Sequence, residues 1–192
     1  MEMMQMLAER RTYRRFLQDK QISQDIIDDI VTAQRYASSA GNLQPLKYVV
    51  VKTAEIVEQI FPLVNWAARL PKELGTPKDG EHPTLFVVVL YEKDKKTGWT
   101  DTDAGLAISN MTFAAWGHGV GSCIMASIDR EQICKVLNIE ERFAIHSVVA
   151  FGYPAHQSKI VDMDGDDISY YLDENNNYCV PKRPLNETVS YK

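Results

Sequence analysis

The sequence has 192 residues, 45% of them hydrophobic, and a formal net charge of −5 at pH 7. A chain of this length can form one domain and bury roughly 70% of the surface that its unfolded form exposes. The negative charge disfavours a nucleic-acid-binding protein, and the longest apolar run, residues 85–91, is far shorter than the ~20 residues that cross a bilayer. We therefore expect a single domain, residues 1–192, without a nucleic-acid or membrane partner.

Cysteine usage and the first residues indicate a reducing compartment. The three cysteines are far apart in sequence and form no CxxC pair. An acid at position 2 and charges from position 9 interrupt any apolar segment of a signal peptide. We expect a cytoplasmic protein. The four histidines are scattered and have no metal-ligand spacing, so we expect no metal site.

The first half of the chain is predicted to alternate helices with strands. Residues 3–10 are typical of a short helix, and a second helix begins after Ser23, with apolar residues at helical spacing. The small and polar residues 38–42 end that helix. A strand at 48–52, a helix from 53 that is broken at Pro62, a loop at 71–83 and a buried strand at 85–91 follow.

The second half contains a helix at 103–116 that is apolar almost all round. Such a helix must be buried on more than one side, which predicts a second subunit on its outer face. Strands at 123–127 and 145–151 are separated by a helix that begins at Asp129, with Gln132 at the capping-box position. Residues 155–192 are polar and offer at most a hairpin of 168–172 against 178–180, so this tail is expected to pack on a partner. The alternation of strands and helices by itself indicates an α/β protein.

Four arginines lie close together near the N-terminus, in the segment ERRTYRRF. Arg10 and Arg14 would share one helical face, and the guanidinium fork matches the oxygens of a phosphate. A small polyanion is therefore a candidate ligand. The alternative is that these arginines only decorate a helix C-terminus, where the dipole favours cations.

A second candidate site is the loop SSAGNLQP, residues 38–45, just before a strand. Its hydroxyls and carboxamides suit ligand binding, because ligands are often bound by loops held on a rigid scaffold. Taken alone, the loop could equally be an ordinary helix end followed by a turn.

Five segments, in order along the chain, resemble the nitroreductase family. They are ERRTYRRF, SSAGNLQPLKYVVV, DAGLAISNMTFAAWGHGVGSC, FGYP and KRPLNETV. The resemblance implies an α+β protein with a three-layer α-β-α fold, a mixed central sheet and an intertwined homodimer, in which residues 155–192 pack on the partner subunit.

The same resemblance implies an FMN-dependent NAD(P)H oxidoreductase, with NADH or NADPH as electron donor. It would reduce small oxidised acceptors such as nitroaromatics or quinones by a ping-pong mechanism. No side chain is expected to be catalytic, because the flavin itself carries the electrons.

The residues that would contact FMN follow from matching positions in the five segments. Arg10, Arg11 and Thr12 would bind the phosphate and ribityl chain, with Lys182 or Arg183 returning to the phosphate. Arg14 and Asn65 would lie near the pyrimidine edge, and Met125, Ala126 and Ser127 would pass the ring. Ser38, Ser39 and Asn42 would reach the flavin from the other subunit.

Two departures from the family pattern concern the substrate. Leu46 stands where many members have Trp, and the loop at 71–83 has no family pattern. Two other functions stay open: an FMN-binding carrier or sensor without turnover, since cofactor motifs do not prove catalysis, and a specialised flavin chemistry such as reductive dehalogenation or flavin cleavage.

Two further motifs are weak. GHGVGSC has glycines at 117, 119 and 121, which breaks the GxGxxG spacing of a dinucleotide-binding loop and follows a helix. DMDGDD resembles the start of a calcium loop, but Asp167 stands where the sharp turn needs Gly.

Overall fold

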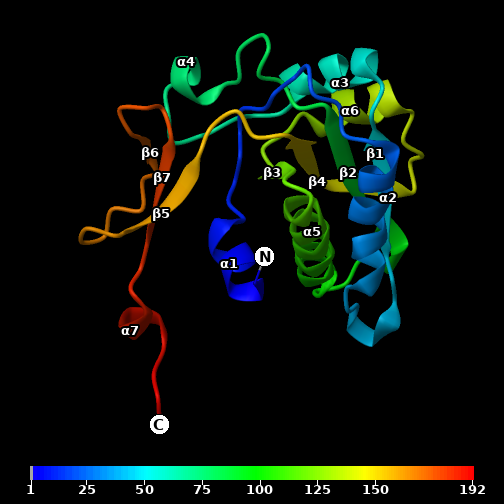
Figure 1. Ribbon diagram of the computed structural model, residues 1–192. Helices are drawn as coiled ribbons and strands as arrows, with labels where there is room; N and C mark the ends of the chain where they lie inside the picture. The colour runs from blue at the N-terminus through cyan, green and yellow to red at the C-terminus, as the bar shows by residue number, and fades with distance from the viewer. Residues whose placement is uncertain (1) are drawn as a thin grey trace.

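The molecule is built around a four-stranded sheet with helices on both of its faces (Figure 1). The computed structural model describes residues 2–192. The strands lie in the order β1-β2-β4-β3, and each neighbouring pair is antiparallel. Their bounds are Leu46–Val51 for β1, Leu85–Glu92 for β2, Gly121–Met125 for β3 and Phe143–Gly152 for β4.

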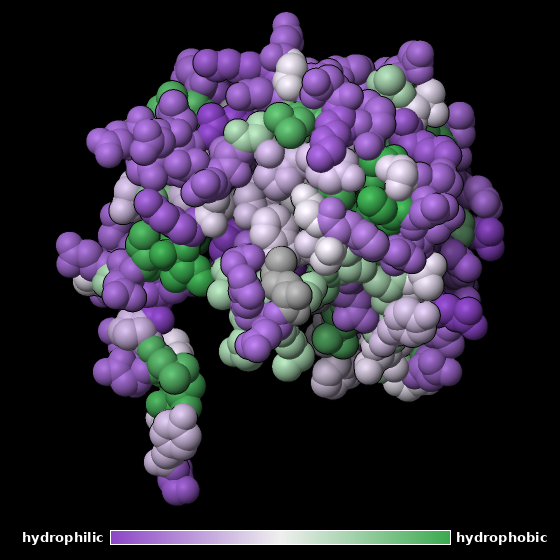
Figure 2. Space-filling model, in the orientation of Figure 1, coloured by the Kyte–Doolittle hydropathy of each residue, from purple (hydrophilic) through white to green (hydrophobic). Residues whose placement is uncertain are grey.

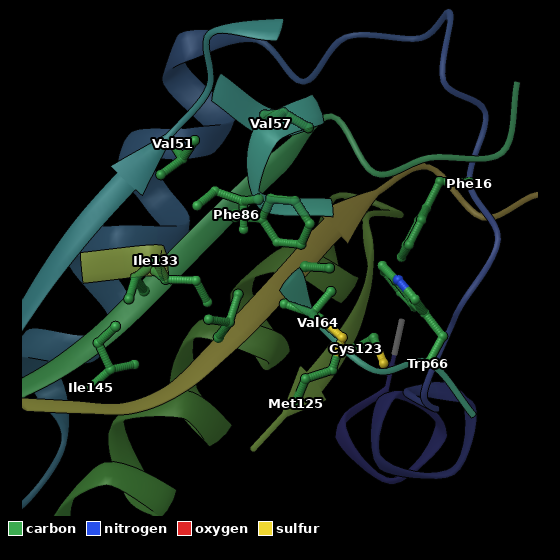
Figure 3. Packing of buried hydrophobic residues seen from close by; sticks show 14 of the residues in the cluster. Phe16, Val51, Val57, Val64, Trp66, Phe86, Cys123, Met125, Ile133 and Ile145 are labelled. Atoms are coloured by element: carbon green, nitrogen blue, oxygen red, sulfur yellow. The ribbon is translucent and has the colours of Figure 1, made fainter. Parts of the chain in front are cut away.

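The central strand β2 separates two hydrophobic clusters, as its continuous apolar sequence predicts. Odd-numbered residues such as Val87 pack against α2 (Gln24–Ala33) and α5 (Thr100–Gly117). Even-numbered residues pack on the other face, where Figure 3 shows Phe86 among the side chains contributed by α3 (Ala54–Ile60) and α6 (Arg130–Leu137). The expected α+β class with three α-β-α layers is confirmed.

The central sheet has less parallel strand pairing than the predicted mixed sheet. All three ladders of the sheet are antiparallel. Parallel pairing to this sheet is confined, within residues 2–192, to an isolated bridge between Thr12 and Ser122 on the edge strand β3. The N-terminal segment therefore runs beside β3, which brings the arginine cluster to this edge of the sheet.

The remaining elements are short. Three are helices of four to seven residues: α1 (Met3–Glu9), α4 (Lys72–Gly75) and α7 (Leu185–Thr188). Four are single 3-10 turns: η1 (Gln34–Tyr36), η2 (Ala40–Asn42), η3 (Phe61–Leu63) and η4 (Lys93–Lys95). The predicted loop at 71–83 contains a short helix that the sequence did not predict, α4.

One of the two predicted helix N-caps makes a side-chain capping hydrogen bond. The Asp129 carboxylate accepts a hydrogen bond from the backbone N–H of Gln132 at 3.1 Å, which confirms the predicted start of α6. Ser23 occupies the N-cap of α2 but its side chain makes no capping hydrogen bond.

The C-terminal tail forms a small sheet of its own, in the order β5-β7-β6. The predicted hairpin is confirmed, although β6 (Tyr171–Leu172) is shorter than expected beside β7 (Tyr178–Lys182). A strand that the sequence did not predict, β5 (Ser158–Asp162), pairs parallel to β7. After β7 the chain projects from the body and carries an apolar patch (Figure 2), where Leu185 is 68% exposed. The tail thus leaves apolar surface without cover in a single chain.

The long helix α5 buries its inner side against the sheet. Its core contacts include Ile108 and Met111, while Leu106 on the outer side is 43% exposed. A subunit covering this outer side stays a prediction. Within residues 2–192 no helix has the length and hydropathy needed to span a bilayer.

Candidate functional site

The edge of β3 holds the N-terminal segment through the backbone. Tyr13 donates its N–H to the carbonyl of Ser122 at 2.9 Å, next to the Thr12 bridge. This close approach needs glycine at position 121, because a Cβ there would lie 2.8 Å from Cγ of Tyr13 and 2.9 Å from Cγ of Pro154. The residues just before Tyr13 are therefore fixed over β3.

A cavity of about 170 Å³ opens where this segment meets β3 and β7. Its lining combines three cations, two hydroxyl groups and two aliphatic side chains: Arg10, Arg11, Lys182, Thr12, Ser122, Ile124 and Val180. The structure thus brings Lys182 to the N-terminal cluster although 170 residues separate it from Thr12 in sequence. Since cations repel one another at close range, such a cavity favours an anion.

Arg10 is held in place from two sides by α5. It donates from Nη1 to Oγ1 of Thr112 at 2.9 Å, and its guanidinium carbon lies 4.6 Å from the centre of the Phe113 ring. Burial, with the charge of Arg11 beside it, lowers the pKa of Arg10. Its buried Nε has no hydrogen-bond partner among residues 2–192. Arg10 is therefore preorganised at the wall of the cavity.

Arg11 makes a contact typical of a helix-end arginine and also lines the cavity. Its Nη2 donates to the carbonyl of Leu7 at 2.7 Å, near the C-terminal end of α1, as a helix-end arginine would. It also lines the cavity, burial lowers its pKa, and its Nε is buried without a partner within the described chain. The helix-end contact thus uses only part of its donor capacity.

The other two arginines of the cluster do not line this cavity. The Arg14 guanidinium carbon lies 4.5 Å from the ring centre of Tyr170 and 4.9 Å from that of Tyr178. Arg15 donates from Nη2 to the carbonyl of Asn176. Both therefore fasten the C-terminal tail to the body, and Arg14 does not lie beside Arg10 as sequence spacing on one helix suggested, because α1 ends at Glu9.

His156 completes this attachment of the tail. Its Nε2 accepts the backbone N–H of Arg14 at 3.0 Å, which leaves Nδ1 to donate to the carbonyl of Gln157 at 2.8 Å. Its ring packs between Tyr13 and Tyr178. Burial, together with the charges of Arg15 and Arg14 nearby, lowers the pKa of His156 from 6.5 to about 4.

We expect this histidine to make the protein acid-sensitive. The unfolded chain takes up the proton at pH values below about 6.5, whereas the folded chain resists it until about pH 4. The free energy of unfolding is therefore expected to decrease as the pH is lowered from about 6.5 to about 4. Below about pH 4 the contribution of His156 levels off. Urea titrations of the wild type and of His156→Gln at several pH values would measure this decrease. Free energies of unfolding that change with pH in the same way in both proteins would contradict the prediction.

Ser127, just after β3, forms a second polar group with Asn65. Asn65 donates from Nδ2 to Oγ of Ser127 at 2.9 Å, and its backbone N–H donates to the Ser127 carbonyl at 3.0 Å. Ala126 and Ser127 are exposed. The Met125 side chain is buried in the core (Figure 3), so only its backbone can face a ligand.

The two basic residues after β7 differ in position. Lys182 lines the cavity, whereas Arg183 forms ion pairs with Asp166 at 3.2 Å and Glu187 at 3.3 Å. Of the two alternatives the sequence left open, the geometry favours Lys182.

The loop of Ser38, Ser39 and Asn42 lies apart from this cavity in the single chain. None of its residues lines the cavity of Arg10 and Lys182. The loop instead contacts Asp103 on α5, through hydrogen bonds from Ser39 Oγ and the Ala40 N–H.

Comparison with known proteins identifies the family of this chain. The model of the nitroreductase family matches residues 7–153. A protein of Archaeoglobus fulgidus, provisionally named an NADH dehydrogenase/NAD(P)H nitroreductase, is 30% identical over 167 residues, which cover 85% of this chain and 91% of the relative. The chain belongs to the nitroreductase family.

Solved structures agree with this assignment at the level of the fold. A nitroreductase family protein from Clostridium difficile 630 superposes with a TM-score of 0.72 at 18% identity, covering 100% of this chain and 99% of that one. A provisionally named nitroreductase from Desulfovibrio desulfuricans, solved in complex with FMN, gives a TM-score of 0.69 at 19% identity, with coverages of 98% and 95%.

Several residues of this candidate site were not predicted from the sequence. Ser122, Ile124 and Val180 line the cavity without having been predicted. Strand alternation could have found them, since Ser122 and Ile124 lie two apart on β3, as do Val180 and Lys182 on β7. No local signal marks Thr112 or Asp103, whose partners are distant in sequence.

Proposed function

We propose that this nitroreductase-family chain is an FMN-dependent oxidoreductase that takes electrons from NADH or NADPH and reduces small oxidised acceptors, such as nitroaromatics or quinones, by a ping-pong mechanism. The observation that carries the proposal is the cavity lined by Arg10, Arg11 and Lys182, which gathers three cations around one small space. The FMN complex of the Desulfovibrio relative supports the cofactor.

The donors in the cavity fit a phosphate group. Arg10 and Arg11 offer planar forks, Lys182 offers a point charge, and Thr12 and Ser122 offer hydroxyls. A dianionic phosphate would accept hydrogen bonds from these side chains and offset the repulsion between the cations. With about 170 Å³, the cavity suits a phosphate and leaves the rest of the cofactor to the open edge of β3.

Residues beyond the cavity could carry the ring. Ile124 is 51% exposed on β3 and offers an apolar surface in the direction of Ala126 and Ser127. Asn65 and Ser127, linked by their hydrogen bond, are placed to meet polar ring atoms. When bound, FMN would supply the redox chemistry, and these residues would fix its position. A role for Arg14 at the pyrimidine edge requires its guanidinium to leave the rings of Tyr170 and Tyr178.

A homodimer is part of the proposal. Ser38, Ser39 and Asn42 lie apart from the phosphate cavity of their own chain, so a second subunit would have to bring them to it. The exposed outer side of α5 and the apolar patch on the projecting tail 183–192 offer surface for such a partner.

Identification of the bound cofactor tests this proposal. Purified protein is expected to be yellow and to release FMN on denaturation, because the cavity accommodates one phosphate group. Chromatography of the released flavin would distinguish FMN from FAD. Release of FAD, or a colourless protein that does not take up added FMN, would contradict the proposal.

A further inference from the structure

Asp103 is a buried carboxylate without a cationic partner. Asp103 lies in the first turn of α5 and is 4% exposed. No Lys, Arg or His of residues 2–192 forms an ion pair with it. A buried carboxylate is tolerated only when hydrogen bonds replace its water. Here Ser39 Oγ donates to Oδ2 at 2.7 Å and the Ala40 N–H donates to Oδ1 at 3.0 Å, so each oxygen has a donor from the same loop.

The loop that Asp103 binds has an unfavourable backbone conformation. The non-glycine residues Asn42 and Gln44 have φ +54° and +48°, which L side chains disfavour, whereas Gly41 at φ +56° bears no such cost. Such conformations persist only where surrounding contacts enforce them. Ser39 Oγ also accepts the backbone N–H of Gln44 at 3.1 Å, so one chain of hydrogen bonds links Asp103 to both ends of the strained segment.

This loop is the wall between two cavities. One, of about 360 Å³, lies on the side of Lys47 and Tyr48, and the other, of about 450 Å³, lies on the side of Trp99 and Leu106. Ser38, Ser39 and Asp103 line both. A movement of the loop would therefore change the shape of both cavities at once.

We propose that Asp103 is a positioning residue, which holds the loop 38–44 in the shape that receives the flavin cofactor. The Ser39 hydroxyl is already engaged by Asp103 and Gln44, so it positions the loop, and the contacts with the cofactor come from Ser38 and Asn42. This inference rests on the proposed FMN site. It assigns to Ser39 a positioning role in place of a direct contact with the flavin.

A double-mutant cycle on FMN binding tests the coupling. Asp103→Asn and Ser39→Ala are each expected to raise the Kd of FMN at least about tenfold, the scale of losing a charge-assisted hydrogen bond. The double variant is expected to be no weaker than the more severe single variant, because both changes break one chain of bonds. If the double variant instead raised the Kd of FMN by the product of the two single factors, Ser39 would contact the cofactor independently. That result would overturn the inference.

The visible circular dichroism of bound flavin, recorded at saturating FMN, adds a readout that a general loss of stability would not change. We expect Asp103→Asn and Ser39→Ala to alter this spectrum in the same way, since both release the loop. If Asp103→Asn fails to fold, Ser39→Ala alone still decides, because an unaltered spectrum and affinity in that variant would overturn the inference.

Amide hydrogen exchange in the apoprotein separates this inference from the proposed function. Asp103→Asn is expected to speed exchange at Ala40 and Gln44 at least about tenfold, whether or not the wild type binds FMN. Asp101→Asn is the matched control, since it removes the same charge two residues earlier on α5 from a side chain that is 87% exposed. Equal effects in both variants, or unchanged exchange in Asp103→Asn, would contradict the positioning role.

Discussion

Arg10→Ala is expected to raise the Kd of FMN about ten- to a hundredfold. The reason is the loss of a charge-assisted hydrogen bond, about 1.5–3 kcal/mol, from a guanidinium that Thr112 and Phe113 already hold in place. Because the side chain is preorganised, little of its binding energy is lost to ordering. Fluorescence titration of the apoprotein with FMN measures the change.

Arg15→Ala is the control for this prediction. Arg15 belongs to the same basic segment but contacts Asn176 in the tail and does not line the cavity. We expect its removal to change FMN affinity by no more than about 0.5 kcal/mol, because its contact with the tail at Asn176 lies outside the cavity. If Arg15→Ala is the more damaging change, or if neither change alters affinity, the phosphate site is not where we place it.

Gly121→Ala is expected to damage both the fold and the site. An added Cβ would lie 2.8 Å from Cγ and 2.9 Å from Cβ of Tyr13, and 2.9 Å from Cγ of Pro154, and none of these is the free end of a flexible side chain. Overpacking of this kind costs about 1–3 kcal/mol of folding stability. The N-terminal segment would also be pushed from β3, so FMN affinity is expected to fall at least about tenfold. Denaturant unfolding and FMN titration measure the two effects.

Gly98→Ala provides the same chemical change without the clash. An added Cβ at Gly98 meets nothing within 4 Å, and the residue lies in an exposed turn before α5. We expect both stability and FMN affinity to stay within about 0.5 kcal/mol of wild type. Equal losses in the two variants would show that the approach of Tyr13 to β3 is not what positions the arginines.

The fold could be predicted where burial dictates the pattern. The apolar run of β2 and the Asp129 cap of α6 carry their own signal, and both were found from the sequence. β5 could not be found, because polar residues flank its two apolar ones, none of its residues is buried, and its parallel pairing with β7 depends on a chain segment 20 residues away. The four strands of the central sheet were therefore easier to predict than the pairing within the tail.

The candidate site was predictable in its N-terminal part and less so elsewhere. Arg10, Arg11 and Thr12 were expected to lie together, and the structure places them around one cavity with Lys182. Spacing on a helix could not show that Arg14 turns towards Tyr170, since the helix ends before it. The contact of Asp103 with Ser39 spans 64 residues, a separation that leaves no periodic pattern in the sequence.

The most direct test of the account is to mix the flavin-loaded protein anaerobically with NADH and with NADPH and follow the visible absorbance of oxidised FMN. If the chain is an FMN-dependent NAD(P)H oxidoreductase, at least one of the two donors bleaches the flavin, and a nitroaromatic or quinone added afterwards restores the colour. Protein that holds FMN but is bleached by neither donor would be a carrier or sensor, and would contradict the proposed activity.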